Sequence, residues 1–401
     1  MKTKFYQYIC LFAACILFCG MYLDTNEIKQ GIIDEVFSSL TSEDEYISDD
    51  LEPYSDYQNT DCKKRFDDLT SSKIDVRYCD ISSVNFENLP KDIINKMSFN
   101  DKTIWPAQMP TWFDLDKINK IGKTPGLNVR ELHKQGITGK GVGIAIIDQP
   151  LSSHQEYRSN LRHYKNFARY KKGTMHGTAV ASIAVGKNIG VAPDANLYFV
   201  VAEFREDYNE ILDAGPVADA INYILELNET LPLKNKISII SISRGFSEYD
   251  SGRKEFQAAL QNAEKQNILV LTTNDIYTVS KDGYLVDSDD LSSYTMSALN
   301  DENIVSLSRN KKILVPTGYR ITACETGEQD YAYYSQGNLG WGVPYLAGVA
   351  ALAKQVKPNL DMKDFFWFAR KTADKITVKD SKGKQYTVKY FINPKRLINS
   401  L

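Results

Sequence analysis

The stretch GNLGWGVPYLAGVAALAKQV, residues 337–356, is the part of this sequence best suited to chemistry. A glycine-bounded loop runs into an apolar helix, and Pro344 falls in the first turn, where its missing N–H costs nothing. A helix N-terminus presents unpaired backbone N–H groups and the positive end of the helix dipole. Hydrolases place a nucleophile at such a point because those N–H groups stabilise a developing oxyanion. Here that place is held by Gly340, which has no side chain.

Two upstream stretches belong with this one. GKGVGIAIIDQPL, residues 139–151, is an apolar strand that ends in Asp148, and MHGTAVASIAVG, residues 175–186, is a helix of small residues led by His176. Asp, then His, then a glycine-rich loop entering a proline-containing helix is the chain order of the subtilisin-type triad. From about Pro125 to its C-terminus the chain therefore resembles the subtilases, a family of serine peptidases.

The resemblance puts the family's serine at Gly340. The family's third motif reads Gly-Thr-Ser-x-Ala-x-Pro, and aligning it on the helix proline leaves Leu339 and Gly342 where Thr and Ala are usual. The resemblance further implies that Asp148 orients and charge-stabilises His176. It implies that His176 acts as general base and then as general acid for serine attack.

The resemblance also implies an oxyanion hole. LTTND follows an apolar strand and is similar to the stretch that supplies the family's asparagine donor, which places Asn274 in that role. The backbone N–H of Gly340 would be the second donor, and glycine preserves it. The alternative interpretation of Asn274 is a turn residue, because an Asn-Asp pair readily makes a turn.

The segment SISRG resembles the strand that pairs with extended substrate in this family. The backbone groups of Ser243, Arg244 and Gly245 would then bind a peptide as an added strand. Arg244 stands where the family usually has an apolar residue. It could select acidic side chains, or it could fill the pocket by pairing with a local carboxylate.

Two hypotheses of function follow from Gly340. Without a hydroxyl there is no acyl-enzyme and no proton for His176 to take, which predicts a catalytically impaired pseudoprotease that binds an extended peptide or a protein partner. The alternative is an active secreted serine endopeptidase, in which Gly340 reflects a misalignment or an inactivated variant; the presence of Asp148 and His176 favours it. Ser335 is a poor substitute nucleophile because it precedes the helix and would have to fold back into the cleft.

Alternating apolar runs and helical patterns from Pro125 onward predict an α/β fold. The expected architecture is a subtilisin-like three-layer fold with a central, mainly parallel sheet, preceded by an N-terminal extension. Buried central strands read as continuous apolar runs, and active groups gather at their carboxyl ends. The expected strands are residues 142–147, 198–201, 237–242, 268–271 and 304–307, and the expected helices are residues 128–135, 217–227 and 255–265.

The sequence before the peptidase-like domain divides into two parts. Residues 1–23 have lysines followed by an apolar run, which predicts a secretory signal or an uncleaved membrane anchor, and hence a secreted or cell-surface protein. Residues 24–124 form an acidic extension, which is either a propeptide or a spacer. The aromatics and prolines of residues 103–115 are expected to pack this extension onto residues 125–401.

Cysteine use fits an exported chain. Removal of the leader leaves Cys62, Cys79 and Cys324. Oxidation of Cys62 to Cys79 would close a short loop and leave Cys324 buried and free. The alternative is that all three cysteines are reduced.

Composition excludes several classes of function. A net charge of −3 gives no reason to expect nucleic acid, and no phosphate-binding or dinucleotide motif is present. His133, His154 and His163 match no metal-site spacing and are interpreted as surface or loop residues. We therefore expect no metal site and no cofactor, although subtilases often carry structural calcium and no ligand loop here can be assigned to one.

Overall fold

The computed structural model describes residue 51 and residues 57–203, 212–295, 311–379 and 382–401. Residues 1–23, the expected strand at residues 304–307, and residues 24–50 and 52–56 of the acidic extension lie outside this part. No helix within it is both long enough and apolar enough to cross a membrane.

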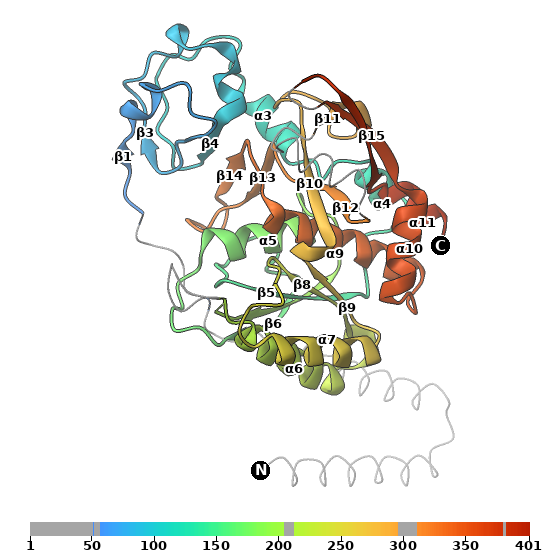
Figure 1. Ribbon diagram of the computed structural model, residues 1–401. Helices are drawn as coiled ribbons and strands as arrows, with labels where there is room; N and C mark the ends of the chain where they lie inside the picture. The colour runs from blue at the N-terminus through green and yellow to red at the C-terminus, as the bar shows by residue number, and fades with distance from the viewer. Residues whose placement is uncertain (1–50, 52–56, 204–211, 296–310, 380–381) are drawn as a thin grey trace, which may run out of the picture. The chain divides into compact units, whose positions relative to one another are not determined.

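A parallel sheet forms the centre of the domain (Figure 1). Within the described residues its order is β6-β7-β5-β8-β9, and every neighbouring pair is parallel. The strands are β5 (Gly143–Asp148), β6 (Leu161–Asn166), β7 (Asn196–Val201), β8 (Ile237–Ile242) and β9 (Leu269–Thr272). β5 lies in the middle and is buried along its whole length, as its apolar sequence predicts.

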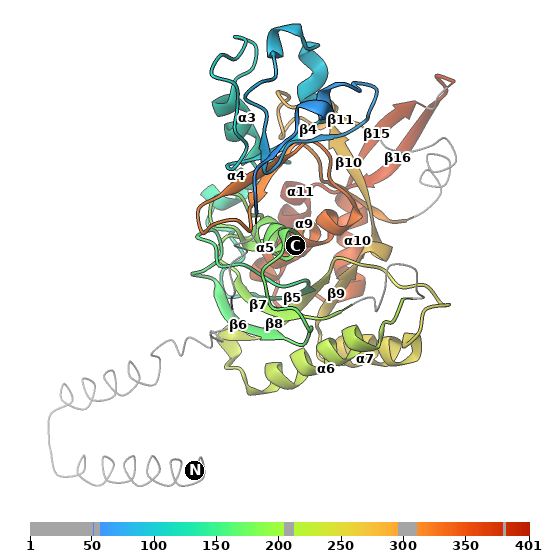
Figure 2. The ribbon, with the colours of Figure 1, turned by 90° about the vertical axis from the view of Figure 1, so that its left-hand side faces the viewer.

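Helices cover both faces of this sheet. One face packs against α5 (Met175–Val185) and α9 (Leu339–Val356), and the other against α6 (Gly215–Thr230) and α7 (Arg253–Lys265). Figure 2 shows α6 and α7 side by side beneath the sheet. Ile144 and Ile146 belong to the core on the α5–α9 side, and Ala145 and Ile147 belong to the core on the other side. The expected three-layer α/β fold is confirmed.

The C-terminal part adds a second, mixed sheet of order β11-β10-β12-β16-β15. Short helices flank it. The elements are α4 (Val129–Lys134), β10 (Ile276–Lys281), β11 (Tyr294–Thr295), β12 (Ile313–Pro316), α10 (Met362–Thr372), β15 (Asp374–Lys379), β16 (Gln385–Phe391) and α11 (Pro394–Asn399). This sheet was not foreseen from the sequence.

The N-terminal extension shares a third sheet with the rest of the domain. Its order is β13-β14-β4-β2, in which β4 and β2 come from the extension and β13 and β14 follow the second sheet's β12. The remaining elements of this region are β1 (Thr60–Asp61), β2 (Ile74–Asp75), β3 (Cys79–Asp80), β4 (Met97–Asn100), α3 (Leu115–Gly122), β13 (Arg320–Ala323) and β14 (Tyr331–Tyr334).

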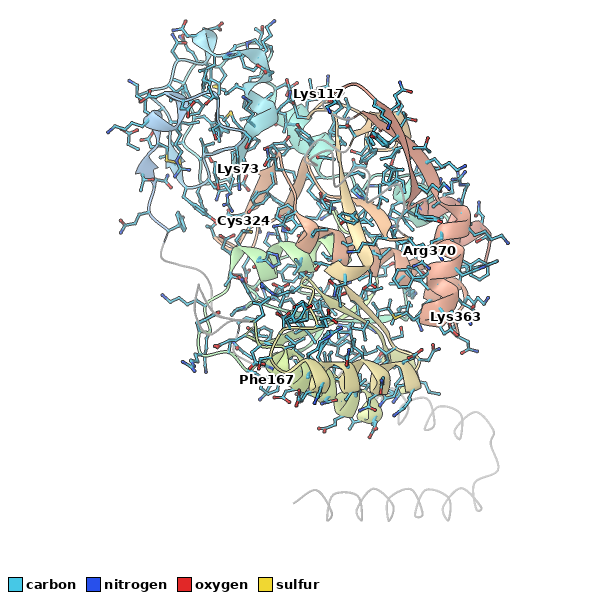
Figure 3. The ribbon with its side chains drawn as sticks, viewed as in Figure 1. Lys73, Lys117, Phe167, Cys324, Lys363 and Arg370 are labelled. Carbon is cyan, nitrogen blue, oxygen red and sulfur yellow. A yellow bond between two sulfur atoms is a disulfide. The ribbon has the colours of Figure 1, made fainter. Side chains whose placement is uncertain are left out.

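Side chains from both parts fill the space beside this third sheet. Phe99 of β4 stacks on Tyr333 of β14 with ring centroids 4.8 Å apart, and Phe113 packs in the same apolar cluster, as expected for residues 103–115. Cys62 and Cys79 form a disulfide, and Cys324 is free and buried. Cys324, labelled with Lys73 in Figure 3, lies where the two parts meet, because Asn100 Nδ2 donates to its Sγ at 3.6 Å.

Candidate active site

The central sheet and two helices bring three predicted site residues together. Asp148 is the last residue of β5, His176 lies in the first turn of α5, and Gly340 lies in the first turn of α9. α5 and α9 pack closely, since a Cβ on Gly348 of α9 would come within 3.3 Å of the carbonyl oxygen of Ala184 of α5. Small residues along both helices permit this approach.

Asp148 and His176 form a hydrogen-bonded pair. The distance from Asp148 Oδ1 to His176 Nδ1 is 2.6 Å, and the same oxygen accepts the N–H of Gln149 at 2.8 Å. Asp148 is only 1% exposed, whereas His176 is half-buried. Burial alone would lower the pKa of the imidazole, but the charge of Asp148 and its hydrogen bond outweigh burial and raise that pKa above the ordinary 6.5.

The second nitrogen of His176 faces position 340. A Cβ built on Gly340 would lie 3.0 Å from His176 Nε2, 3.2 Å from Asn338 Oδ1 and 3.3 Å from the carbonyl oxygen of Ser243. A side chain at position 340 would therefore point at the nitrogen that a general base uses. The structure thus places Asp148 beside His176 and His176 beside position 340, in the order of a catalytic triad whose third position has no side chain.

The predicted peptide-binding segment follows β8 directly. The carbonyl oxygen of Ser243 lies next to Gly340. A Cβ on Gly245 would lie 2.3 Å from Asn274 Oδ1. Arg244 donates its N–H to the carbonyl of Ile242 at 2.7 Å, and its side chain is half-buried. The segment thus lies between the histidine and the predicted oxyanion donor.

Asn274 lies in a short 3-10 turn, Thr273–Asp275, that packs against α9. The side chains of Thr272 and Asp275 form a capping box that fixes the turn. Asn274 Nδ2 donates to the carbonyl of Phe246 at 3.0 Å, which leaves one of its two amide hydrogens for another acceptor. No hydrogen bond of the described residues joins Asn274 to Gly340, so its oxyanion role stays a prediction.

The buried hydroxyl of Ser335 has no hydrogen-bond partner among the described residues. Ser335 is 1% exposed, and its backbone oxygen accepts the N–H of Tyr319 at 3.2 Å in the turn between β12 and β13. No contact of the described residues connects its hydroxyl with His176. The residue that sequence reasoning missed is Asn338, whose side-chain oxygen Oδ1 also faces position 340; its place two residues before Gly340 was the available signal.

None of the three histidines interpreted as surface or loop residues is exposed, although His154 does lie in a loop. His154 is fully buried and bonds to the carbonyl of Asp330 at 2.8 Å. His133 and His163 are half-buried and bond to the carbonyl of Val191 and the hydroxyl of Tyr223. These contacts are structural. Within the part of the chain that the structure describes, no cluster of three or more His, Cys, Asp or Glu residues could hold a metal ion.

Part of the chain matches a known protein family. Residues 139–331 match the model of the subtilase family, peptidase S8. This part of the chain spans the whole of the β5–α5 unit and the predicted peptide-binding segment. The chain therefore carries a subtilase-family domain.

The curated relatives are proteases. The chain is 24% identical to a thermostable alkaline protease of Halalkalibacterium halodurans, over 58% of this chain and 62% of the relative. It is 25% identical to the subtilisin-like protease PopC of Myxococcus xanthus, over 57% and 54% of the two chains. The chain thus spans a little over half the length of these relatives.

One solved structure, titled as that of the prenylagaramide maturation protease PagA, is 17% identical. It covers 68% of this chain and 97% of its own, with a TM-score of 0.49.

Proposed function

We propose that this protein is a pseudoprotease, which binds an extended peptide or a protein partner in a subtilase cleft and does not cut it. One observation carries the proposal: the position that faces His176 Nε2 is glycine. An imidazole there has no hydroxyl to deprotonate, and no acyl-enzyme can form. In subtilisin, loss of the serine costs about 10⁶-fold in turnover.

The peptide would bind along residues 243–245. The backbone of Ser243, Arg244 and Gly245 would pair with it as an added strand, because main-chain hydrogen bonds give affinity without demanding a particular sequence. Asn274 and the N–H of Gly340 would then face the peptide carbonyl as oxyanion donors. That the relatives are named as proteases supports a peptide or protein as the ligand.

A second candidate is an active serine endopeptidase. The observation in its favour is the 2.6 Å contact between Asp148 and His176, since a cleft that only binds has no chemical need of that pair. It would require a nucleophile other than residue 340.

Export of the protein is part of the proposal. The disulfide between Cys62 and Cys79 suits an oxidising compartment, and one relative is named as a minor extracellular protease of Bacillus subtilis. Residues 1–23 would act as the signal or as a membrane anchor. Residues 24–124 would be the extension, and residues 125–401 the subtilase domain.

Labelling with a fluorophosphonate, which reacts with activated serines, tests this function. We expect no labelling of the natural chain, clear labelling of Gly340→Ser, and none of Gly340→Ala, which adds the methyl group without the hydroxyl. Labelling of the natural chain at any serine would contradict the pseudoprotease proposal and favour the endopeptidase. If a correctly folded Gly340→Ser stays unlabelled, the cleft has lost more than its nucleophile.

A further inference from the structure

A small cavity of about 10 Å³ lies between the end of β10 and the start of β13. Its wall includes two basic residues, Lys281 and Arg320, and two hydroxyl-bearing residues, Ser288 and Thr317. All four are at least nine-tenths buried, with exposed fractions of 4%, 6%, 4% and 3%. A space of this size holds one particle about as large as a water molecule.

The two cations lack carboxylate partners. Among the described residues, no ion pair includes Lys281 or Arg320. The buried Nε of Arg320 has no hydrogen-bond partner there, and its Cζ lies 5.9 Å from the ring centroid of Tyr345. Lys281 Nζ donates to Ser288 Oγ at 2.9 Å. Since a buried cation without acceptors is costly, these donors point to a ligand that accepts hydrogen bonds.

Two nearby carboxylates do not meet this need. Asp289 Oδ1 accepts the N–H of Asn128 at 2.6 Å, and Asp287 Oδ1 accepts the N–H of Asp289 at 2.9 Å. Burial, followed by repulsion from Arg320, lowers the pKa of Lys281 to about 8, and the two aspartates only partly oppose this. The positive charge inside the cavity is therefore incompletely compensated.

We propose that this cavity binds a single small monovalent anion of halide size. Arg320 would donate its Nε–H, Lys281 its ammonium hydrogens and Ser288 its hydroxyl. Because Ser288 Oγ already accepts from Lys281, its own hydrogen is left to donate. The donor set suits an anion, and the small volume favours an ion of halide size over phosphate or sulfate.

The cavity supports the loop that leads to Gly340. Thr317 begins the turn between β12 and β13, and a Cβ on Gly337 would lie 2.5 Å from the Thr317 carbonyl oxygen. Tyr319, in the same turn, donates its N–H to the carbonyl of Ser335 at 3.2 Å. An anion joining β10 to β13 would thus stabilise the turn on which residues 335–337 rest.

Thermal unfolding of the full chain in sodium chloride and in sodium gluconate, at equal ionic strength, tests the site. We expect the Tm to rise by a few degrees with chloride and to saturate, whereas gluconate, too large for the cavity, has no such effect. Arg320→Met and Lys281→Met should each abolish the chloride dependence. Lys363→Met, which removes an exposed lysine on α10, is the control and should retain it.

A bromide soak of crystals of the natural chain gives a direct second readout. An anomalous peak within hydrogen-bond distance of Arg320 Nε supports the proposal. A water molecule at that position, or the same Tm in both salts, overturns it. If Arg320→Met does not fold, the bromide soak decides the question by itself.

Discussion

Position 340 differs from a serine by one methylene and one hydroxyl, and the hydroxyl is the group that would attack. His176 Nε2 lies 3.0 Å from a Cβ built at this position, and the hydrogen bond to Asp148 orients the imidazole. This contact is tighter than an ordinary van der Waals contact, so a serine here would require His176 to shift by a few tenths of an ångström.

The ionisation of His176 should make stability depend on pH. Its folded pKa is raised above 6.5, so its contribution to stability is fully present below about pH 6.5 and is lost as pH rises through the raised value. We expect His176→Gln to destabilise the protein more near pH 5.5 than near pH 9, measured by denaturant unfolding. In an NMR titration, Asp148→Asn should bring the His176 pKa below 6.5, because only burial then acts on it.

His133 serves as a control, because its pKa is shifted in the opposite direction to that of His176. Burial lowers its pKa, so the stability that it contributes is present at high pH and is lost as pH falls. His133→Gln should therefore cost more near pH 9 than near pH 5.5. An identical pH dependence for the two variants would contradict the assigned electrostatics.

The contacts of single residues were predictable only where a motif marked them. Asp148, His176 and Gly340 stand in motifs of recognisable order, and the structure brings them together. His154 stands in none, and its partner Asp330 is 176 positions away. A long-range contact of that kind leaves no periodic signal in the sequence, which explains why the burial of His154 was not predicted.

At the scale of elements, the approach of α9 to its neighbours should be sensitive to added volume. A Cβ on Gly348 would lie 2.5 Å from Val191 Cβ, so we expect Gly348→Ala to lower the free energy of unfolding by about 1–3 kcal/mol. Gly340→Ala should change it by no more than about 1 kcal/mol, since a gain in helix propensity offsets a milder contact. Denaturant unfolding of both variants measures the difference, and equal costs would contradict the packing described for α9.

The central elements could be predicted from apolar runs and the outer ones could not. β5, β7, β8 and β9 are buried on both faces and read as continuous apolar runs. β4 and β14 are four residues each and pair across more than 200 positions of chain. Strands so short carry too few residues for a period-two pattern to stand out.

At the scale of the whole molecule, the extension and the subtilase domain share one sheet and one apolar cluster. Arg77 Nη1 donates to the hydroxyl of Tyr334 at 2.6 Å, and the ring of Tyr334 packs edge-on against Trp341 at 4.5 Å. Gln336 Nε2 donates to the carbonyl of Ser72 at 2.7 Å. The extension thus contacts residues shortly before Gly340 directly, and reaches Trp341 only through Tyr334.

A chain that starts at residue 125 tests whether the extension is dispensable. Its removal would leave β14 unpaired on one edge and would expose Ile321 and Tyr333, so we expect loss of cooperative unfolding and aggregation. A chain that starts at residue 57 should unfold like the full chain. A truncated chain that stays folded and soluble would instead favour a removable propeptide.

The most direct test of a retained cleft without chemistry is mass spectrometry of a peptide library incubated with the natural chain, with Gly340→Ser, and with Gly340→Ser combined with His176→Ala. We predict that the natural chain leaves every peptide bond intact, that Gly340→Ser cuts peptides at defined positions, and that the double variant does not. Specific cleavage by the natural chain, lost in His176→Ala, would contradict the account and make this protein a working peptidase.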